Sequence, residues 1–465
     1  MEYDVIVVGG GPAGEVLAER TARAGLNVAL IEVELVGGEC PFWACMPSKA
    51  LLRSVHALAA ARRVPGAGEA VTGELDVAAV LAHRDELISH LDDAEQEAAL
   101  VGAGVVVVRG RGRLNGPRRV DVTGADGALT ELRARHAVVL ATGSVAAIAP
   151  VPGLAQASPW TSREATTASA VPKRLVVLGG GVVGVEMAQA WRGLGSEQVV
   201  VVVREPQLMP TLEPFVGERL VAALRQEGIE VLLDTEAGRV EREPGGERVV
   251  HLPGGRTLVC DELLAATGRR PATEDAGLAT VGLEPGEDVA VDDTMLVAGT
   301  DWLYAIGDVN GRALVTHQGK YQARVAAAAV LARSRGEEPP YRAEADDAAV
   351  PQVIFTDPEI AAVGLSSAEA TERGLRVRTV EFELGDTAAA LLHARDYSGR
   401  AALVVDDGAS VIVGATFVGQ DVAELVHAAT IAIVGQVPLE RLRHAVPSFP
   451  TLSEVWLSLL AEYGQ

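Results

Sequence analysis

The amino-acid sequence predicts an α/β protein in which one strand–turn–helix–strand unit occurs twice and an α+β segment follows. Two glycine-rich turns, at residues 9–14 and 179–184, each follow a short apolar run and precede a helix-like stretch. A hydrophobic fraction of 48% and 50 glycines fit buried strands joined by tight turns. Since 465 residues exceed one ordinary core, we expect two to four domains.

The first unit comprises a strand at residues 4–8, the glycine turn, a helix to residue 24 and a strand at residues 27–31. In such a unit Gly9 permits the tight turn, Gly11 lets a pyrophosphate approach the backbone, and Gly14 lets the helix pack on the strand. Glu32, eighteen residues after Gly14, lies where a carboxylate accepts from ribose hydroxyls. The pattern predicts a dinucleotide site.

The second unit repeats this order, with strands at residues 174–178 and 198–203 and a helix to residue 194. Gly179, Gly181 and Gly184 correspond to Gly9, Gly11 and Gly14 of the first unit. Arg204 stands where an NAD-selective site places an acid, which favours NADPH over NADH. Glu205 opposes that preference, and a solvated Arg204 without a role stays open as an alternative.

The segments outside these units have other patterns. Residues 76–100 read as helical and residues 105–139 as a meander of strands. Both units end in Ala-Thr-Gly, at residues 141–143 and 266–268. Proline-marked stretches at residues 150–159 and 337–340 predict connections. Strands at residues 402–405 and 411–417 and a helix at residues 422–433 predict a third domain of α+β type.

Charge and cysteine content exclude several classes of protein. The formal net charge is -23, from 40 basic and 63 acidic side chains, which disfavours nucleic acid and anionic lipid as partners. The N-terminus lacks a cationic leader, and no apolar run reaches the ~18 residues of a membrane span. Three cysteines are too few for a disulfide-stapled secreted fold. We expect a cytoplasmic protein.

The strongest chemical signal is the pair Cys40 and Cys45. On an ideal helix, residues five apart have Cα atoms ~8–9 Å apart, whereas a disulfide needs roughly 4.4–6.8 Å. A bond therefore requires a distorted segment, and Pro41 and Pro47 are candidate disruptors. A thiolate near Lys49 and the N-terminus of a following helix would have a lowered pKa. A metal site is disfavoured, because only His56 lies nearby; two unrelated buried thiols remain the alternative.

The chain resembles the flavoprotein disulfide reductases, the family of dihydrolipoamide dehydrogenase, glutathione reductase and mercuric reductase. The resemblance covers essentially the whole chain. It is carried by VIVVGGGPAG, GGECPFWACMPSKALLR, VVLATGS, VVLGGGVVGVE, AATGRRP, YAIGDV, THQGKYQAR, PQVIFTDPEIAAVG and FPTLSE.

The resemblance implies two Rossmann-like dinucleotide-binding domains, for FAD and NAD(P), and a C-terminal α+β dimerisation domain. The expected FAD-binding domain comprises residues 1–149 and 272–345, the NAD(P)-binding domain residues 150–271, and the dimerisation domain residues 346–465. The chain would form a homodimer and act on a small-molecule electron acceptor.

The resemblance also implies roles for individual residues. Cys45 would contact the flavin, Cys40 would exchange with the substrate, and Lys49 would pair with Glu186 near the flavin. Glu454 belongs to the C-terminal motif. The residues expected to bind FAD are Gly9, Gly11, Gly14, Glu32, Lys49, Gly112, Thr142, Gly143, Asp308 and His317, and those expected to bind the nicotinamide nucleotide are Gly179, Gly181, Gly184, Arg204 and Gly268.

The sequence departs from the family at the C-terminal motif His-Pro-Thr-x-x-Glu, where Phe449 replaces the histidine. Phenylalanine transfers no proton, and loss of a general acid–base costs ~10²–10⁴ in rate. His444, five residues upstream, is expected at the surface. Phe42 and Trp43 stand where the family carries small or polar residues, and they narrow access to Cys40 or simply fill a variant core.

Three hypotheses follow. The leading one is an NAD(P)H-dependent oxidoreductase with FAD and a Cys40–Cys45 relay. In the second, motivated by Phe449, the flavin alone reduces a quinone, dye, oxygen or metal ion and the cysteines are vestigial. In the third, the chain senses the redox state of its cofactors. The sequence does not name the acceptor. Mercuric reductase would require a C-terminal cysteine pair, which residues 459–465 lack, and Cys260 reads as an inert core thiol.

Overall fold

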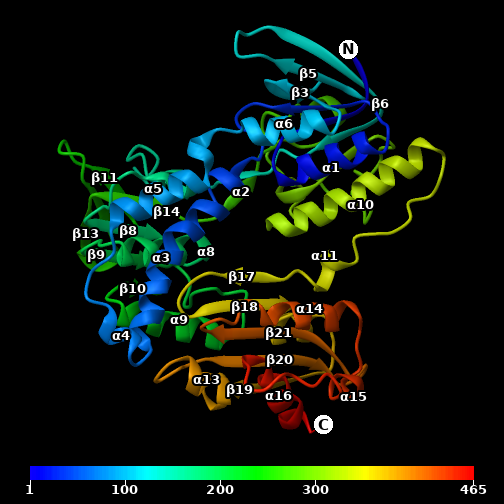
Figure 1. The fold of residues 1–465 in the computed structure, drawn as a ribbon. Coiled ribbons are helices and arrows are strands. Elements are labelled where there is room, and N and C mark those ends of the chain that lie inside the picture. The colour runs from blue at the N-terminus through cyan, green and yellow to red at the C-terminus, as the bar shows by residue number, and fades with distance from the viewer. Residues whose placement is uncertain (465) are drawn as a thin grey trace. The chain divides into compact units, whose positions relative to one another are not determined.

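The structure is a computed structural model that describes residues 1–464, so residue 465 of the predicted C-terminal domain lies outside the described residues (Figure 1). The chain forms two compact units. Unit 1 comprises Met1–Pro47, Arg84–Ala147 and Arg269–Asp346, and unit 2 comprises Ser48–His83, Ile148–Gly268 and Asp347–Gln465. Two helices, α3 (Cys45–Arg63) and α5 (Val77–Leu87), contribute residues to both.

Unit 1 is built on a seven-stranded sheet with the order β3-β2-β1-β6-β5-β4 and with β16 paired to β6. Parallel pairing joins β1 to β2 and β6, β2 to β3, and β16 to β6, whereas β4, β5 and β6 are antiparallel. The strands are β1 (Glu2–Val8), β2 (Val28–Glu32), β3 (Val105–Arg109), β4 (Arg111–Leu114), β5 (Arg119–Thr123), β6 (Leu129–Leu140) and β16 (Leu303–Ala305); a separate antiparallel pair consists of β7 (Ser144–Ala146) and β15 (Arg269–Pro271).

The helices α1 (Pro12–Arg23) and α10 (Thr316–Ser334) lie side by side in unit 1 (Figure 1). Pro12 at the first position of α1 fixes a helical φ where no backbone donor is needed. Leu17 and Ala18 of α1 are fully buried in the same core cluster as Ala323 and Ala326 of α10. The remaining helical segments are α2 (Glu39–Phe42), η1 (Ser89–Leu91), α6 (Ala94–Gly102), η3 (Leu278–Val281), η4 (Gly307–Asn310) and α11 (Ala345–Ala348).

Two sequence predictions for unit 1 need correction. Residues 105–109 are not part of the meander but form β3, a parallel strand beside β2; an apolar run of this length does not reveal its pairing partner. The predicted helical stretch at residues 76–100 is two helices, α5 and α6. Ser89, His90 and Leu91 between them have positive φ angles of 50°, 51° and 61°, which end a right-handed helix.

Unit 2 contains the second strand–turn–helix–strand unit. Its parallel sheet has the order β10-β9-β8-β14, and a three-stranded antiparallel sheet has the order β11-β12-β13. The strands are β8 (Arg174–Leu178), β9 (Gln198–Val202), β10 (Glu230–Leu232), β11 (Arg239–Arg242), β12 (Arg248–His251), β13 (Thr257–Cys260) and β14 (Glu262–Ala265). The accompanying helices are α4 (Ala67–Ala70), α7 (Ser162–Thr167), α8 (Val182–Gly193), α9 (Pro214–Gln226) and η2 (Pro253–Gly255). Trp191 of α8 is fully buried and donates to the carbonyl of Ala165 at 3.1 Å.

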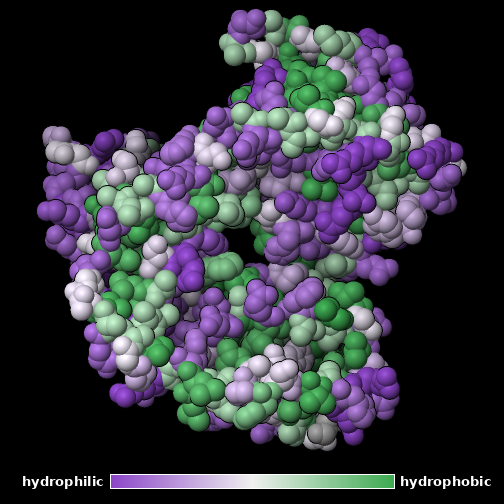
Figure 2. Space-filling view, in the orientation of Figure 1, coloured by the Kyte–Doolittle hydropathy of each residue, from purple (hydrophilic) through white to green (hydrophobic). Residues whose placement is uncertain are grey.

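The C-terminal part of unit 2 is a five-stranded antiparallel sheet with the order β17-β18-β21-β20-β19. Its elements are β17 (Gln352–Ile354), β18 (Glu359–Gly364), α12 (Ser367–Glu372), β19 (Val377–Glu383), η5 (Leu384–Asp386), α13 (Ala388–His393), β20 (Arg400–Asp406), β21 (Val411–Gly419), α14 (Leu425–Val434), α15 (Leu439–Leu442), η6 (Leu452–Glu454) and α16 (Val455–Tyr463). Large apolar side chains are exposed here, and Figure 2 shows a hydrophobic patch over α13, where Leu391 and Leu392 are 81% and 72% exposed.

Throughout residues 1–464, the helices lack the combined length and apolar character that crossing a bilayer requires.

Candidate functional site

The first glycine turn, at the carboxyl end of β1, is held by close backbone contacts. Gly9 has φ +108°, and a Cβ there would lie 2.2 Å from the carbonyl oxygen of Ala141. A Cβ at Gly14 would lie 2.0 Å from the oxygen of Gly9. At Gly11 a Cβ would meet nothing within 4 Å. Gly9 and Gly14 are therefore required by the fold, whereas Gly11 leaves open space beside the first turn of α1, where a pyrophosphate can approach.

Glu32, at the end of β2, is buried and shapes the same turn. One carboxylate oxygen accepts from the backbone N–H of Gly10 and the other from that of Glu34, each at 2.7 Å. A carboxylate has about four acceptor positions, so ribose hydroxyls can still donate to it. The structure thus gives Glu32 a second role in fixing the turn.

A buried hydroxyl beside this turn has no protein partner. The Oγ1 atom of Thr142 is buried and makes no hydrogen bond within residues 1–464, and Gly143 after it has φ +71° with open space at its Cβ position. Ser144 donates a short hydrogen bond to the carboxylate of Asp308 in η4. Buried polar groups are normally satisfied, so an unpaired hydroxyl beside an open glycine cradle fits a bound dinucleotide such as FAD.

Two other predicted FAD residues have different surroundings. Gly112 lies in β4, where a Cβ would be 3.0 Å from Val8 and 3.2 Å from Ile31. Close packing on these apolar side chains already explains glycine at this position, and its contact with a cofactor stays a prediction. His317 is exposed in the first turn of α10.

The two predicted redox cysteines lie on either side of a helix break. Cys40 is in α2, Trp43 terminates this short helix with φ -134° and ψ 0°, and α3 begins at Cys45. The distorted segment is as predicted, but the prolines are not its cause. Pro41 and Pro47 both lie within the first turn of their helices, where proline is tolerated because no intrahelical donor is lost.

Cys40 and Cys45 form no disulfide in this structure, and their thiols contact each other through a hydrogen bond. The hydrogen bond to Cys45, together with burial, raises the pKa of Cys40 well above its usual range. The sequence predicted a lowered pKa for a thiolate near Lys49 and the N-terminus of the following helix, and the thiol in that position is Cys45, the first residue of α3. The sulfur of Cys45 also lies 3.6 Å from the hydroxyl of Thr316, at the start of α10.

Lys49, one turn after Cys45 in α3, forms the predicted pair with Glu186. Its Nζ atom donates to Oε2 of Glu186 at 2.7 Å, and Glu186 is only 3% exposed. The other oxygen of Glu186 accepts from the backbone N–H of Phe355 at 2.9 Å, and Nζ of Lys49 lies 5.0 Å from the Phe355 ring centroid. Glu186 therefore fixes Lys49 and the chain after β17 together.

A polar network that the sequence did not reveal supports this pair from the next turn of α8. The side chain of Gln189 accepts from the backbone N–H of Asp357 at 2.7 Å and donates to its carbonyl at 2.9 Å. It also donates to Glu227 at 2.6 Å. Burial raises the pKa of Glu227 to about 7, and burial lowers the pKa of His56.

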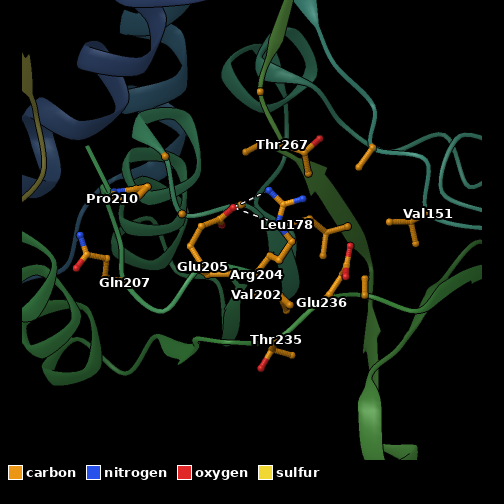
Figure 3. A pocket seen from close by; sticks show the side chains of 18 residues that line it. Val151, Leu178, Val202, Arg204, Glu205, Gln207, Pro210, Thr235, Glu236 and Thr267 are labelled. Atoms are coloured by element: carbon orange, nitrogen blue, oxygen red, sulfur yellow. Dashed lines mark hydrogen bonds and ion pairs between the residues drawn. The ribbon is translucent and has the colours of Figure 1, made fainter. Parts of the chain in front are cut away.

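The second glycine turn repeats the first. Cβ atoms at Gly179 and Gly184 would lie 2.1 and 2.2 Å from the carbonyl oxygens of Ala266 and Gly179, and one at Gly181 would meet nothing within 4 Å. A cavity of about 330 Å³ opens beside this turn (Figure 3). The cavity is lined by the glycines 179–181 and by Gly268, whose contact with a nucleotide stays a prediction. Its volume lies within the usual range of ligand pockets.

Arg204 and Glu205 face each other at the rim of this cavity (Figure 3). The guanidinium of Arg204 donates to one carboxylate oxygen of Glu205 at 2.8 and 3.2 Å. Arg204 is 72% exposed. Arg204 is therefore largely solvated and is also ion-paired with its neighbour, and its part in nucleotide selection stays a prediction.

The C-terminal motif begins with an exposed residue and ends with a half-buried one. Phe449 is 75% exposed, and His444 is exposed, as expected. The Oε2 atom of Glu454 is buried and has no hydrogen-bond partner in the part of the chain that the structure describes. The motif thus retains a half-buried glutamate with one buried carboxylate oxygen and without an imidazole beside it in sequence.

The sequence also missed Arg269, whose side chain contacts three residues of unit 1. It forms hydrogen bonds with Glu39, beside Cys40, and with Ser144, and it lies 3.9 Å from Asp308. Arg269 is part of the motif AATGRRP, but Glu39 lies 230 positions away in the chain. No local pattern predicts such a pair.

Two glycine turns at parallel strand ends and a thiol pair define a class of protein: a dinucleotide-binding redox protein. The comparisons agree. The family model "Pyridine nucleotide-disulphide oxidoreductase" matches residues 3–330, and its dimerisation domain matches residues 350–459.

The chain is similar to mercuric reductase from Shigella flexneri, with 33% identity covering 97% of this chain and 78% of the relative. It is similar to dihydrolipoyl dehydrogenase from Chlamydia muridarum, with 30% identity covering 98% and 95%. Among solved structures, LpdA from Mycobacterium tuberculosis has a TM-score of 0.84 at 26% identity, covering 99% of this chain and 100% of that one. The flavoprotein disulfide reductase RclA from Escherichia coli, at 23% identity, shares the fold with a TM-score of 0.85, covering 99% of each chain.

The chain therefore belongs to the pyridine nucleotide-disulphide oxidoreductase family, whose members are NAD(P)H-dependent flavoenzymes. This confirms the resemblance and the predicted fold class of two dinucleotide-binding domains with a C-terminal dimerisation domain. The family uses FAD and a pyridine nucleotide.

Proposed function

We propose that this chain takes electrons from NAD(P)H and delivers them, by way of bound FAD, to a redox-active disulfide of Cys40 and Cys45, and from there to a disulfide or another small acceptor. The observation that carries the proposal is the contact between the two thiols across the break after α2. When bound, FAD supplies the group that accepts a hydride and releases electrons in pairs.

The two cysteines have different tasks in this proposal. Cys45 is the first residue of α3, whose helix N-terminus favours a thiolate. Cys40 keeps its proton, since contact with Cys45 and burial raise its pKa. Reduction of the disulfide consumes two electrons and two protons and gives two thiols. The Cys40 sulfur then attacks one sulfur of the acceptor disulfide and passes its proton to the first product thiol, which leaves, so that a mixed disulfide remains. The Cys45 thiolate attacks the Cys40 sulfur of this mixed disulfide and restores the Cys40–Cys45 bond, and the second product thiol leaves with the second proton.

The ion pair of Lys49 and Glu186 belongs to the same proposal. Lys49 provides a positive charge one turn after Cys45, and a positive charge stabilises an anionic reduced flavin. Glu186 holds that charge in place. Glu454, buried and unpaired at one oxygen in the described chain, is proposed as the remaining acid of the C-terminal motif.

We also propose that NADPH is preferred and NADH accepted. Arg204 supplies a cation suited to a 2′-phosphate, whereas Glu205 competes for that cation and can accept from the ribose hydroxyl of NADH. The dimerisation domain and its exposed apolar side chains support a homodimer. The cytoplasmic location stays a prediction.

A second function is favoured by the exposed Phe449, which cannot supply the proton that a thiol product requires. In this alternative a quinone, dye, oxygen or metal ion takes electrons directly from the flavin, and the cysteines are not required.

A steady-state screen separates the two functions. NADPH and NADH are offered side by side with disulfides, quinones, dyes and metal ions, for wild type and for the double variant Cys40→Ser/Cys45→Ser. The relay predicts that the double variant loses at least about 10²-fold in disulfide reduction. Equal rates for both proteins with every acceptor would overturn the relay and favour direct transfer.

A further inference from the structure

Arg269 makes a set of contacts that fixes its guanidinium in one orientation. Its Nη2 atom donates to Oε2 of Glu39 and to the carbonyl of Ser144, each at 2.7 Å, and its Nε donates to the hydroxyl of Ser144 at 2.7 Å. The side chains of Arg269 and Glu39 are each only 24% exposed. Most surface ion pairs contribute little, but a guanidinium held by several hydrogen bonds keeps its position without further loss of side-chain freedom.

Glu39 connects this cation to the redox cysteines. It is the first residue of α2, and Cys40 follows it directly. A helix of four residues cannot sustain itself, because helix nucleation is unfavourable. Its start is tied down at Gly38, where φ is +65° and a Cβ would lie 2.7 Å from the Cα atom of Gly11, and at Glu39 by Arg269.

The same cation lies among carboxylates of the proposed FAD site. The hydroxyl of Ser144 donates to the carboxylate of Asp308, and the backbone carbonyl of Ser144 accepts from Arg269. The Nε atom of Arg269 is 3.9 Å from Asp308. One positive charge therefore lies beside both Glu39 and Asp308, and its removal would make the surroundings of Cys40 more negative.

We propose that the charges of the Arg269–Glu39 ion pair, held beside Cys40, set how readily the Cys40–Cys45 disulfide is reduced. The proposal rests on the proposed relay. The half-reaction is disulfide plus two electrons and two protons to two thiols, one of which then releases a proton to give a thiolate. Loss of the Arg269 charge disfavours the thiolate and hence reduction, whereas loss of the Glu39 charge favours both.

The test measures the equilibrium between disulfide and dithiol in the FAD-loaded protein. The protein is poised in dithiothreitol buffers of graded potential, and the thiols of Cys40 and Cys45 are alkylated and counted by peptide mass spectrometry. Arg269→Gln should lower the equilibrium constant for reduction threefold to tenfold, a potential about 15–30 mV more negative. Glu39→Gln should shift it in the opposite direction, and the double variant should return toward wild type.

Arg270 provides a matched control, since it is the next residue and pairs at 2.8 Å with Glu274, the two side chains being 46% and 63% exposed. Arg270→Gln should leave the potential unchanged. An Arg269→Gln potential equal to that of Arg270→Gln, or shifts of the same sign in Arg269→Gln and Glu39→Gln, would overturn the proposal. If Cys40 and Cys45 of the wild type form no disulfide at any potential, the relay itself would be overturned, and this proposal with it.

Discussion

The two glycine turns of this chain have nearly the same backbone contacts, but different side chains stand at the end of the second strand of each unit. In both, the first and third glycines lie too close to backbone oxygens for any side chain, and the middle glycine faces open space. Eighteen residues after the third glycine, the first unit has Glu32, buried and bonded back to Gly10, and the second has Val202. Two residues further on, Arg204 is exposed and held by Glu205.

This difference shows that the backbone geometry of a glycine turn and the choice of nucleotide depend on different residues. The turn depends on backbone contacts that tolerate only glycine, whereas nucleotide choice depends on side chains at the end of the second strand. Glu32 fixes its own turn and has little freedom, but the Arg204–Glu205 pair can open without disturbing the fold. This difference fits the proposed function, in which the first unit keeps FAD bound and the second exchanges NAD(P)H.

The largest expected effect comes from closing either turn. In Gly14→Ala the new Cβ would meet the oxygen of Gly9 at 2.0 Å, and in Gly184→Ala that of Gly179 at 2.2 Å, each costing about 3 kcal/mol or more. Gly14→Ala should lose bound flavin, whereas Gly184→Ala should retain it and no longer be reduced by NADPH. Flavin absorbance, urea unfolding and anaerobic reduction check this.

Matched controls exist in both turns. Gly11→Ala and Gly181→Ala meet no atom within 4 Å, so they should unfold like wild type while weakening nucleotide binding. Normal flavin content in Gly14→Ala would contradict the account of the first turn.

The next largest effect concerns a difference in stabilising contacts between α1 and α8, the helices that follow the two turns. Two residues after the third glycine, α1 has Val16 and α8 has Glu186, which is 3% exposed and paired with Lys49. Glu186→Gln should cost about 2–3 kcal/mol, because it leaves Lys49 unpaired and weakens the bond from Phe355. Urea unfolding measures the loss.

The exposed pair of Glu19 and Arg23 in α1 is the control, with side chains 39% and 69% exposed. Glu19→Gln should cost less than about 0.5 kcal/mol. Equal losses in Glu19→Gln and Glu186→Gln would contradict a structural role for the Lys49 pair.

Burial raises the pKa of one glutamate in each unit to about 7. These residues are Glu15 in unit 1 and Glu227 in unit 2. A raised folded-state pKa contributes stability below the unfolded value of 4.5, and that contribution is lost as pH rises through about 7. Glu15→Gln and Glu227→Gln should therefore each flatten the decline in unfolding free energy between pH 5 and pH 8, by about 1–2 kcal/mol. A decline unchanged in both variants would contradict burial as the cause.

The smallest effect concerns the rim of the second site. Arg204→Gln should lower the ratio of kcat/KM for NADPH to that for NADH about fivefold to tenfold, since an exposed charge-assisted contact is worth about 1 kcal/mol. Glu205→Gln should raise the ratio about threefold by freeing the guanidinium. Initial rates with both nucleotides measure it, and a ratio unchanged in both variants would show that this pair does not select the nucleotide.

The sequence predicted the parts of the molecule that depend on local rules. Both turns, their strands and helices, and the break between Cys40 and Cys45 follow from requirements of backbone geometry. The pairing of Lys49 with Glu186 followed only from the family resemblance. Arg269 and Glu39 were missed because neither residue has a local signature.

The remaining errors have a common physical origin. The strand at residues 105–109 was assigned to the meander because an apolar run does not specify its neighbour. The raised pKa of Cys40 was not predicted, because it depends on the contact with Cys45 and on burial. Such properties arise from tertiary contacts rather than from sequence spacing.

The central claim is that electrons reach a sulfur couple beyond the flavin, and an anaerobic reductive titration tests it most directly. Because a disulfide takes up two electrons, wild type should consume about two electrons per chain more than Cys45→Ser before its absorbance stops changing. Equal electron uptake by the two proteins would contradict the account.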